Sequence, residues 1–134
     1  MIVLDENLPD SQRRLLRSWR IRVQQIGHEL GRRGMRDAEI VPFLRRLQRL
    51  TFFTRDDWFY QPTHRHAENC LVLLAIAEDE AASFIRRVLR HPSLNTHAKR
   101  KGKVVRATHA GLRVWRLNGD IEERLAWPRS GGAR

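Results

Sequence analysis

The feature that most constrains the fold is an unbroken apolar run from Cys70 to Ala77. A strand is apolar at every position when both of its faces are covered, as happens in the centre of a parallel sheet. The run therefore predicts a central strand of an α/β sheet. No apolar run approaches the roughly 18 residues that a membrane span requires, and Asp5 interrupts the N-terminus before a signal sequence can develop. We expect neither export nor contact with a membrane.

Segments with strand and helix patterns alternate along the chain, as in a largely parallel sheet with helices packed on it. No repeat or linker-like stretch divides the sequence, so we expect one domain over residues 1–128 and a disordered tail over 129–134. A late pair of strands is expected to form an antiparallel hairpin at the sheet edge. The expected strands are 2–4, 22–26, 50–54, 70–77, 103–108 and 112–117, and the expected helices are 10–19, 37–47 and 80–90.

The chain is strongly basic, with 26 Lys and Arg against 15 Asp and Glu and a formal net charge of +11. Such an excess favours an anionic partner, with nucleic acid first and an acidic protein second. The single cysteine, Cys70, cannot form an internal disulfide and begins the apolar run, so we expect a buried thiol and a cytoplasmic protein.

Acidic residues follow the predicted strands. Asp5 and Asp56 each stand just past a strand, Asp57 follows Asp56, and Asp37 and Glu39 begin a helix. In an open α/β sheet these positions converge on the crevice where ligands bind. Carboxylates gathered in one place repel one another unless a cation neutralises them, and oxygen ligands suit Mg²⁺ or Mn²⁺. Such a site can support phosphodiester hydrolysis.

The segments Leu4-Asp5-Glu6-Asn7, Gly34-Met35-Arg36-Asp37-Ala38-Glu39-Ile40 and Phe53-Thr54-Arg55-Asp56 together resemble the small PIN-like proteins related to VapC-type toxins. The resemblance covers about the first two-thirds of the chain. It implies a PIN-like three-layer fold with a metal-dependent ribonuclease site, often partnered by a small antitoxin. By position, Asp5 would be the central metal ligand, Asp37 or Glu39 the second, and Asp56 the third.

The resemblance breaks two residues after Asp56, where such proteins carry another acid and this chain has Trp58. Asp57 would then supply the fourth ligand from a shifted position, or the fourth ligand is missing. Trp58 is also the one tryptophan expected in a loop beside the acids, where it can stack on a base.

Structural roles compete with each functional assignment. Asp5 can cap the following helix, Asp37 is a good N-cap, Glu39 can complement a helix dipole, and Asp56 and Asp57 can form a turn. Clustered basic residues can hold RNA phosphates or simply remain solvated. The candidates for phosphate binding are Arg32, Arg33, Arg36, Arg55, Lys99, Arg100, Lys101 and Lys103.

Two functions of different classes follow from the sequence. The first is a Mg²⁺- or Mn²⁺-dependent endoribonuclease of PIN-like toxin type, with Asp5, Asp37, Glu39 and Asp56 as the catalytic acids. The second is a non-catalytic PIN-like module that binds RNA or an acidic protein. The RNA target, the antitoxin and the oligomeric state, a homo-oligomer included, stay open.

Overall fold

The computed structural model describes residues 1–129, and within this range seven strands form one sheet in the order β2-β1-β3-β4-β5-β6-β7. The first five strands of that order run parallel, whereas β6 is antiparallel to both β5 and β7. The strands are β1 (Ile2–Leu4), β2 (Gln24–Gln25), β3 (Thr51–Thr54), β4 (Cys70–Leu74), β5 (Val104–Thr108), β6 (Gly111–Trp115) and β7 (Glu123–Leu125).

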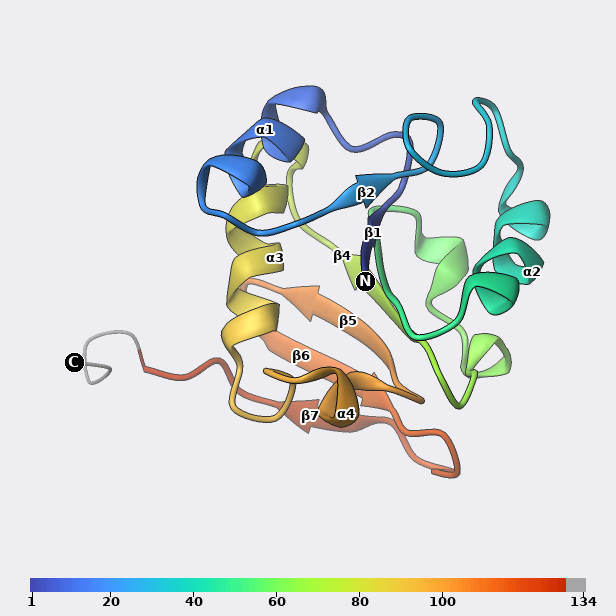
Figure 1. Ribbon diagram of the computed structural model, residues 1–134. Helices are drawn as coiled ribbons and strands as arrows, with labels where there is room; N and C mark the ends of the chain where they lie inside the picture. Colours follow the sequence, from blue (N-terminus) through green and yellow to red (C-terminus); the bar gives the residue numbers. More distant parts are fainter. Residues whose placement is uncertain (130–134) are drawn as a thin grey trace.

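Helices cover both faces of the sheet and make three layers (Figure 1). Leu16 of α1 and Ile85 of α3 pack in one core with Val72 of β4, whereas Ile40 of α2 packs in a second core with Phe52 of β3. The helices are α1 (Asp10–Ser18), α2 (Asp37–Leu47), α3 (Ala81–Arg90) and α4 (His97–Arg100), with short 3₁₀ turns η1 (Asp57–Phe59), η2 (Pro62–His64) and η3 (Glu78–Glu80). No helix in residues 1–129 is long and apolar enough to cross a membrane.

The predicted centre of the sheet is confirmed. β4 is the middle strand, every one of its residues is buried, and the Cys70 thiol lies inside, where burial raises its pKa to about 12.

The C-terminal strands differ in one respect from the prediction. β5 and β6 form the expected antiparallel hairpin, but the hairpin is not the edge, because the unpredicted strand β7 pairs with β6 beyond it. β7 has only three residues, Glu123–Leu125, and two of them are charged, so its sequence carries little strand signal. Most of the tail expected over 129–134 lies outside the described residues.

The parallel strands give the sheet two chemically different ends. Asp5 and Arg55 follow β1 and β3 at the carboxyl end, whereas Lys103 precedes β5 at the amino end. Because side chains that follow parallel strands gather at one edge, the carboxyl end is where the acids meet.

Candidate functional site

Asp5 is the buried centre of the acidic group. Only 5% of the residue is exposed, and Oδ2 accepts a 2.6 Å hydrogen bond from the Thr54 hydroxyl. Burial raises the pKa of the Asp5 carboxyl, while the Thr54 hydroxyl and the backbone N–H groups of Glu6 and Asn7 oppose the rise. No basic side chain forms an ion pair with Asp5 within residues 1–129. Asp5 is therefore a desolvated carboxylate that hydrogen bonds, and no ion pair within residues 1–129, stabilise.

Asp37 and Asp56 join Asp5 from two other segments. A hydrogen bond to the Asp56 carboxyl, partial burial and the charges of Asp56 and Asp5 together raise the pKa of Asp37 to about 6. The charge of Asp56 also contributes to the raised pKa of Asp5. Three carboxyl groups that were far apart in the sequence therefore lie close enough to affect one another's ionisation.

The helix-capping interpretation of Asp37 is wrong. α2 begins at Asp37, and its N-cap is Arg36. Glu39 performs the capping, because its side chain accepts the Arg36 backbone N–H at 3.0 Å and also pairs with Arg32. The Asp37 carboxyl is left free to face Asp56.

Asp5 does not cap a helix either. The N-cap of α1 is Pro9, and no side chain caps that terminus. Asp56 does have a structural role, because its Oδ1 accepts the Trp58 backbone N–H at 2.9 Å at the start of η1. The turn interpretation of Asp56 therefore holds alongside its contact with Asp37.

Two sequence candidates stand apart from this group. The Glu39 carboxylate binds the Arg36 backbone N–H and the Arg32 side chain. Both contacts lower the pKa of Glu39, and the Arg36 N–H has the larger effect. Asp57 is exposed at the first residue of η1 and is not among the groups that shift the pKa of Asp5 or Asp37.

A small cavity of about 190 Å³ opens beside the acids and is lined by Asp5, Asn7, Leu8, Arg55 and Asp56. The Nε of Arg55 donates to the carbonyl of Ile76 at 2.9 Å, so its side chain is fixed next to the carboxylates. The cavity thus combines anionic oxygens with one cationic donor, as a site for a metal and a phosphate would.

The acidic turn is held by residues that the sequence did not single out. The buried amide of Gln25 donates to the carbonyls of Asp5 and Leu8 at 2.9 and 3.0 Å. Glu6 accepts the Gly34 N–H at 2.8 Å, which ties the loop before α2 to this turn. A glutamine in a strand gives no sequence signal for such a role.

The basic candidates divide between the two ends of the sheet. Arg32, Arg33 and Arg36 lie in the loop before α2, and Arg32 is paired with Glu39. Lys99, Arg100, Lys101 and Lys103 lie near the amino end of β5, away from the acids.

Arg100 is not on the surface. It is 8% exposed, and its guanidinium donates to the Thr51 hydroxyl and the Leu94 carbonyl at 2.9 and 2.8 Å. Burial lowers the pKa of Arg100. Its interactions serve the fold, so the predicted run of surface cations is interrupted.

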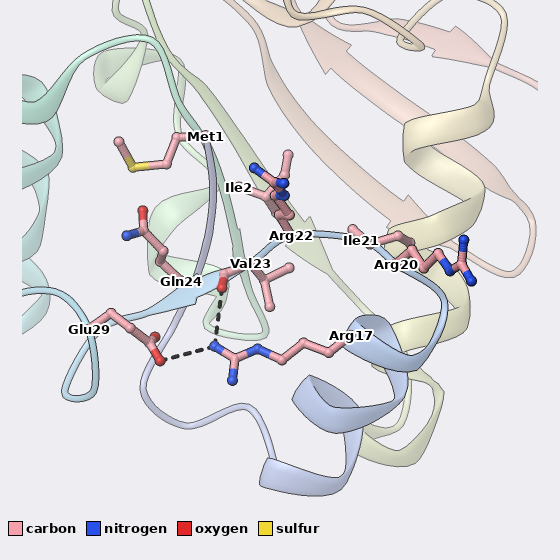
Figure 2. A pocket seen from close by; sticks show the side chains of 9 residues that line it. All are labelled: Met1, Ile2, Arg17, Arg20, Ile21, Arg22, Val23, Gln24 and Glu29. Carbon is pink, nitrogen blue, oxygen red and sulfur yellow. Dashed lines mark hydrogen bonds and ion pairs between the residues drawn. The ribbon is translucent and has the colours of Figure 1, made fainter.

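A larger hollow, of about 650 Å³, lies against β2 and contains none of the predicted site residues (Figure 2). There Arg17 binds both the Val23 carbonyl and Glu29, at 3.4 and 3.0 Å, and Glu29 accepts the Gln25 N–H at 2.9 Å. The side chains of Arg20 and Arg22 do not converge with Arg17 on one point (Figure 2). Size alone therefore does not mark this hollow as the site.

The ligand atoms that the three carboxylates offer are of the kind that a hard divalent cation prefers. The carboxylates of Asp5, Asp37 and Asp56 offer only oxygen, and the Asp37–Asp56 repulsion is the kind that a cation relieves. Within residues 1–129, however, no three His, Cys, Asp or Glu side chains are already arranged to hold a metal ion.

Comparison of the chain with protein-family models, with curated proteins and with solved structures finds no match.

Proposed function

We propose that this chain is a Mg²⁺- or Mn²⁺-dependent endoribonuclease of PIN-like type that hydrolyses RNA phosphodiester bonds. The observation that supports it is the convergence of Asp5, Asp37 and Asp56 at the carboxyl end of the parallel sheet, with mutual effects on their ionisation. Perturbed carboxylates that share a cleft are candidates for functional groups. The basic charge of the chain and the resemblance of its three acidic segments support RNA as the substrate.

Each residue has a distinct part in this proposal. Asp5, fixed by Thr54, is the central ligand, and Asp37 and Asp56 are the second and third. The bound cation would supply Lewis-acid stabilisation of the charge that develops on the phosphoryl group. Arg55, which lines the same cavity, binds a phosphate oxygen and holds the substrate in place.

A second function is favoured by two specific observations. Trp58 stands where the resembled proteins carry an acid, and no ready-made metal group exists in the described residues. A non-catalytic module would keep the fold and bind RNA, or an acidic protein such as an antitoxin, without cutting.

Cleavage of a mixed pool of single-stranded RNA separates the two functions. We expect wild-type protein to cut with Mg²⁺ or Mn²⁺ and to stop with a chelator. Asp5→Asn should reduce cutting at least about 100-fold while RNA binding persists, because only an anionic ligand is removed. The matched control is Asp79→Asn, an exposed carboxylate in η3 with no side-chain partner in residues 1–129. Binding without metal-dependent cleavage by wild type would establish the non-catalytic alternative.

A further inference from the structure

Three arginines stand directly opposite one another on the C-terminal strands. Arg106 of β5 pairs in register with Arg113 of β6, and Arg113 pairs with Arg124 of β7. Residues in register on neighbouring strands point to the same face of a sheet. Arg106, Arg113 and Arg124 therefore form a cross-strand row of positive charge, here called the arginine row.

The arginine row continues a line that starts at the acids. Thr54 of β3 is in register with Leu73 of β4, and Leu73 is in register with Arg106. Thr54 also binds Asp5, which follows β1. The carboxylates and the arginine row thus lie on one level and on one face of the sheet, the face that carries α2 over its other half.

The three arginines share a hollow. Together with Thr108 they line a depression of about 350 Å³. Arg113 and Arg124 are exposed, and Arg106 is half-buried.

Within residues 1–129, one acid partly balances this charge. Glu122 lies 3.6 Å from Arg113 and also accepts from the Tyr60 hydroxyl. Arg106 and Arg124 have no ion-pair or side-chain hydrogen-bond partner among the residues that the structure describes. Like charges directly opposite one another destabilise a sheet, so an anion bound between them would relieve a cost already present in the fold.

We propose that the arginine row is a phosphate-binding track for single-stranded RNA, which it leads across the sheet to Asp5, Asp37 and Asp56. The proposal rests on the ribonuclease function proposed above and names its substrate class. Guanidinium groups bind phosphate oxygens in bidentate fashion, which suits a row of three.

The spacing suits a short stretch of RNA. Strands about 4.8 Å apart place Arg106 about 10 Å and Arg124 about 19 Å from Thr54. About six stacked nucleotides at ~3.4 Å each cover the longer distance, and fewer do so when extended.

Trp58 favours a single strand over a duplex. The residue is 37% exposed, and its ring packs edge-on against Phe59 with centroids 5.0 Å apart and has its centroid 4.5 Å from that of the His64 ring. Its backbone N–H is bound to Asp56, so the indole is anchored next to the acids. Stacking on an exposed indole requires an unpaired base.

The test measures binding without cleavage. Fluorescence anisotropy of a labelled 12-nucleotide RNA of mixed sequence is recorded in EDTA over a range of KCl. The arginine-row variant is Arg106→Gln/Arg113→Gln/Arg124→Gln. We expect at least about a 10-fold loss of affinity at low salt and a fall of about 2 in the slope of log K against log salt, since each lost contact to a single strand contributes about 0.7.

The matched control removes the same charge from the amino end of the sheet, as Arg49→Gln/Lys99→Gln/Lys101→Gln, three exposed residues. Its slope should stay within about 0.5 of wild type. Glu122→Gln should tighten binding, because it removes the acid beside Arg113. Circular dichroism checks that every variant is folded.

Three results would each overturn the track. These are equal losses of RNA affinity in the two triple variants, unchanged RNA affinity of the arginine-row variant, and duplex RNA that competes as well as single-stranded RNA. Binding that depends on the arginine row, with no metal-dependent cleavage by wild type, would keep the track and reject the ribonuclease. Metal-dependent cleavage by wild type, together with normal RNA binding by the arginine-row variant, would keep the ribonuclease and reject the track.

Discussion

The hydroxyl of Thr54 donates a 2.6 Å hydrogen bond to Oδ2 of Asp5, and Oγ1 of Thr54 accepts the backbone N–H of Asp56 at 3.0 Å. One side chain at the end of β3 therefore fixes the buried carboxylate after β1 and the turn that carries its neighbour. Thr54 is itself fully buried, so water cannot replace it.

Replacing this hydroxyl tests how far the site depends on it. Thr54→Val keeps the shape but removes the only side-chain donor that Asp5 has within residues 1–129 and leaves it the backbone N–H groups of Glu6 and Asn7, at a cost of about 1–3 kcal/mol. Thermal unfolding at pH 7.5 should occur roughly 5–10 °C lower than in wild type. Thr54→Ser, which keeps the hydroxyl, is the control, and its melting temperature should fall much less. Equal melting temperatures for Val and wild type would show that the bond contributes nothing to stability.

The Asp37–Asp56 contact predicts a pH-dependent stability. The pKa of Asp37 is raised to about 6 in the folded chain from an ordinary value of 3.8, so the native state binds the proton more tightly. Stability therefore falls as the pH rises from about 4 to about 6, and the loss is complete above that range. Asp37→Asn should abolish this loss of stability. Its melting temperature at pH 7.5 should be about 3 °C above that of wild type, a value reduced for solvent screening, and the two proteins should differ little at pH 4. A melting temperature for Asp37→Asn below that of wild type at pH 7.5 would contradict this account.

A bound cation should be visible in thermal unfolding. A ligand held only by the native state stabilises it by mass action, so millimolar Mg²⁺ or Mn²⁺ should raise the melting temperature of wild type at pH 7.5. The rise should be smaller at pH 5, where Asp37 is largely protonated. It should vanish in Asp5→Asn/Asp56→Asn and persist in Asp79→Asn. A shift that survives the double substitution would place the cation elsewhere.

Glu29 predicts the opposite response to acid. The Gln25 N–H chiefly, with Arg17 and Arg13, lowers the pKa of Glu29 to about 2 from 4.5. Its stabilisation is present above pH 4.5 and is lost as the pH falls toward 2. Wild type should melt about 2–4 °C above Glu29→Gln at pH 7, and the two should converge near pH 2. Glu78→Gln, an exposed carboxylate in η3, is the control, and a constant difference across this pH range would contradict the prediction.

The sequence predicts the strands and the carboxyl-end acids well because their signals are local. The continuous apolar run at Cys70 leads directly to β4, and Asp5 follows β1 as expected. Asp37 shows the limit of such local signals. A capping role for Asp37 required the helix to start one residue later than it does, and in the structure Glu39 caps the helix instead.

Features that depend on how the strands pair could not be predicted from the sequence. Arg106, Arg113 and Arg124 become neighbours only through the pairing of β5, β6 and β7, and β7 carries almost no strand signal of its own. The burial of Arg100 depends on Thr51, which lies 49 residues away in the sequence. Basic residues adjacent in sequence were therefore a poor guide to which cations share a surface.

The contacts of Arg17 and Glu29 at β2 bear on how copies of this chain meet. The border strand of a sheet usually exposes a ladder of backbone groups that can recruit a foreign strand and extend into fibrils or swapped dimers. Here the outward carbonyl of Val23 and the outward N–H of Gln25 are both occupied by these side chains. An incoming strand would first have to break the Arg17–Glu29 ion pair, so this border of the sheet discourages polymerisation.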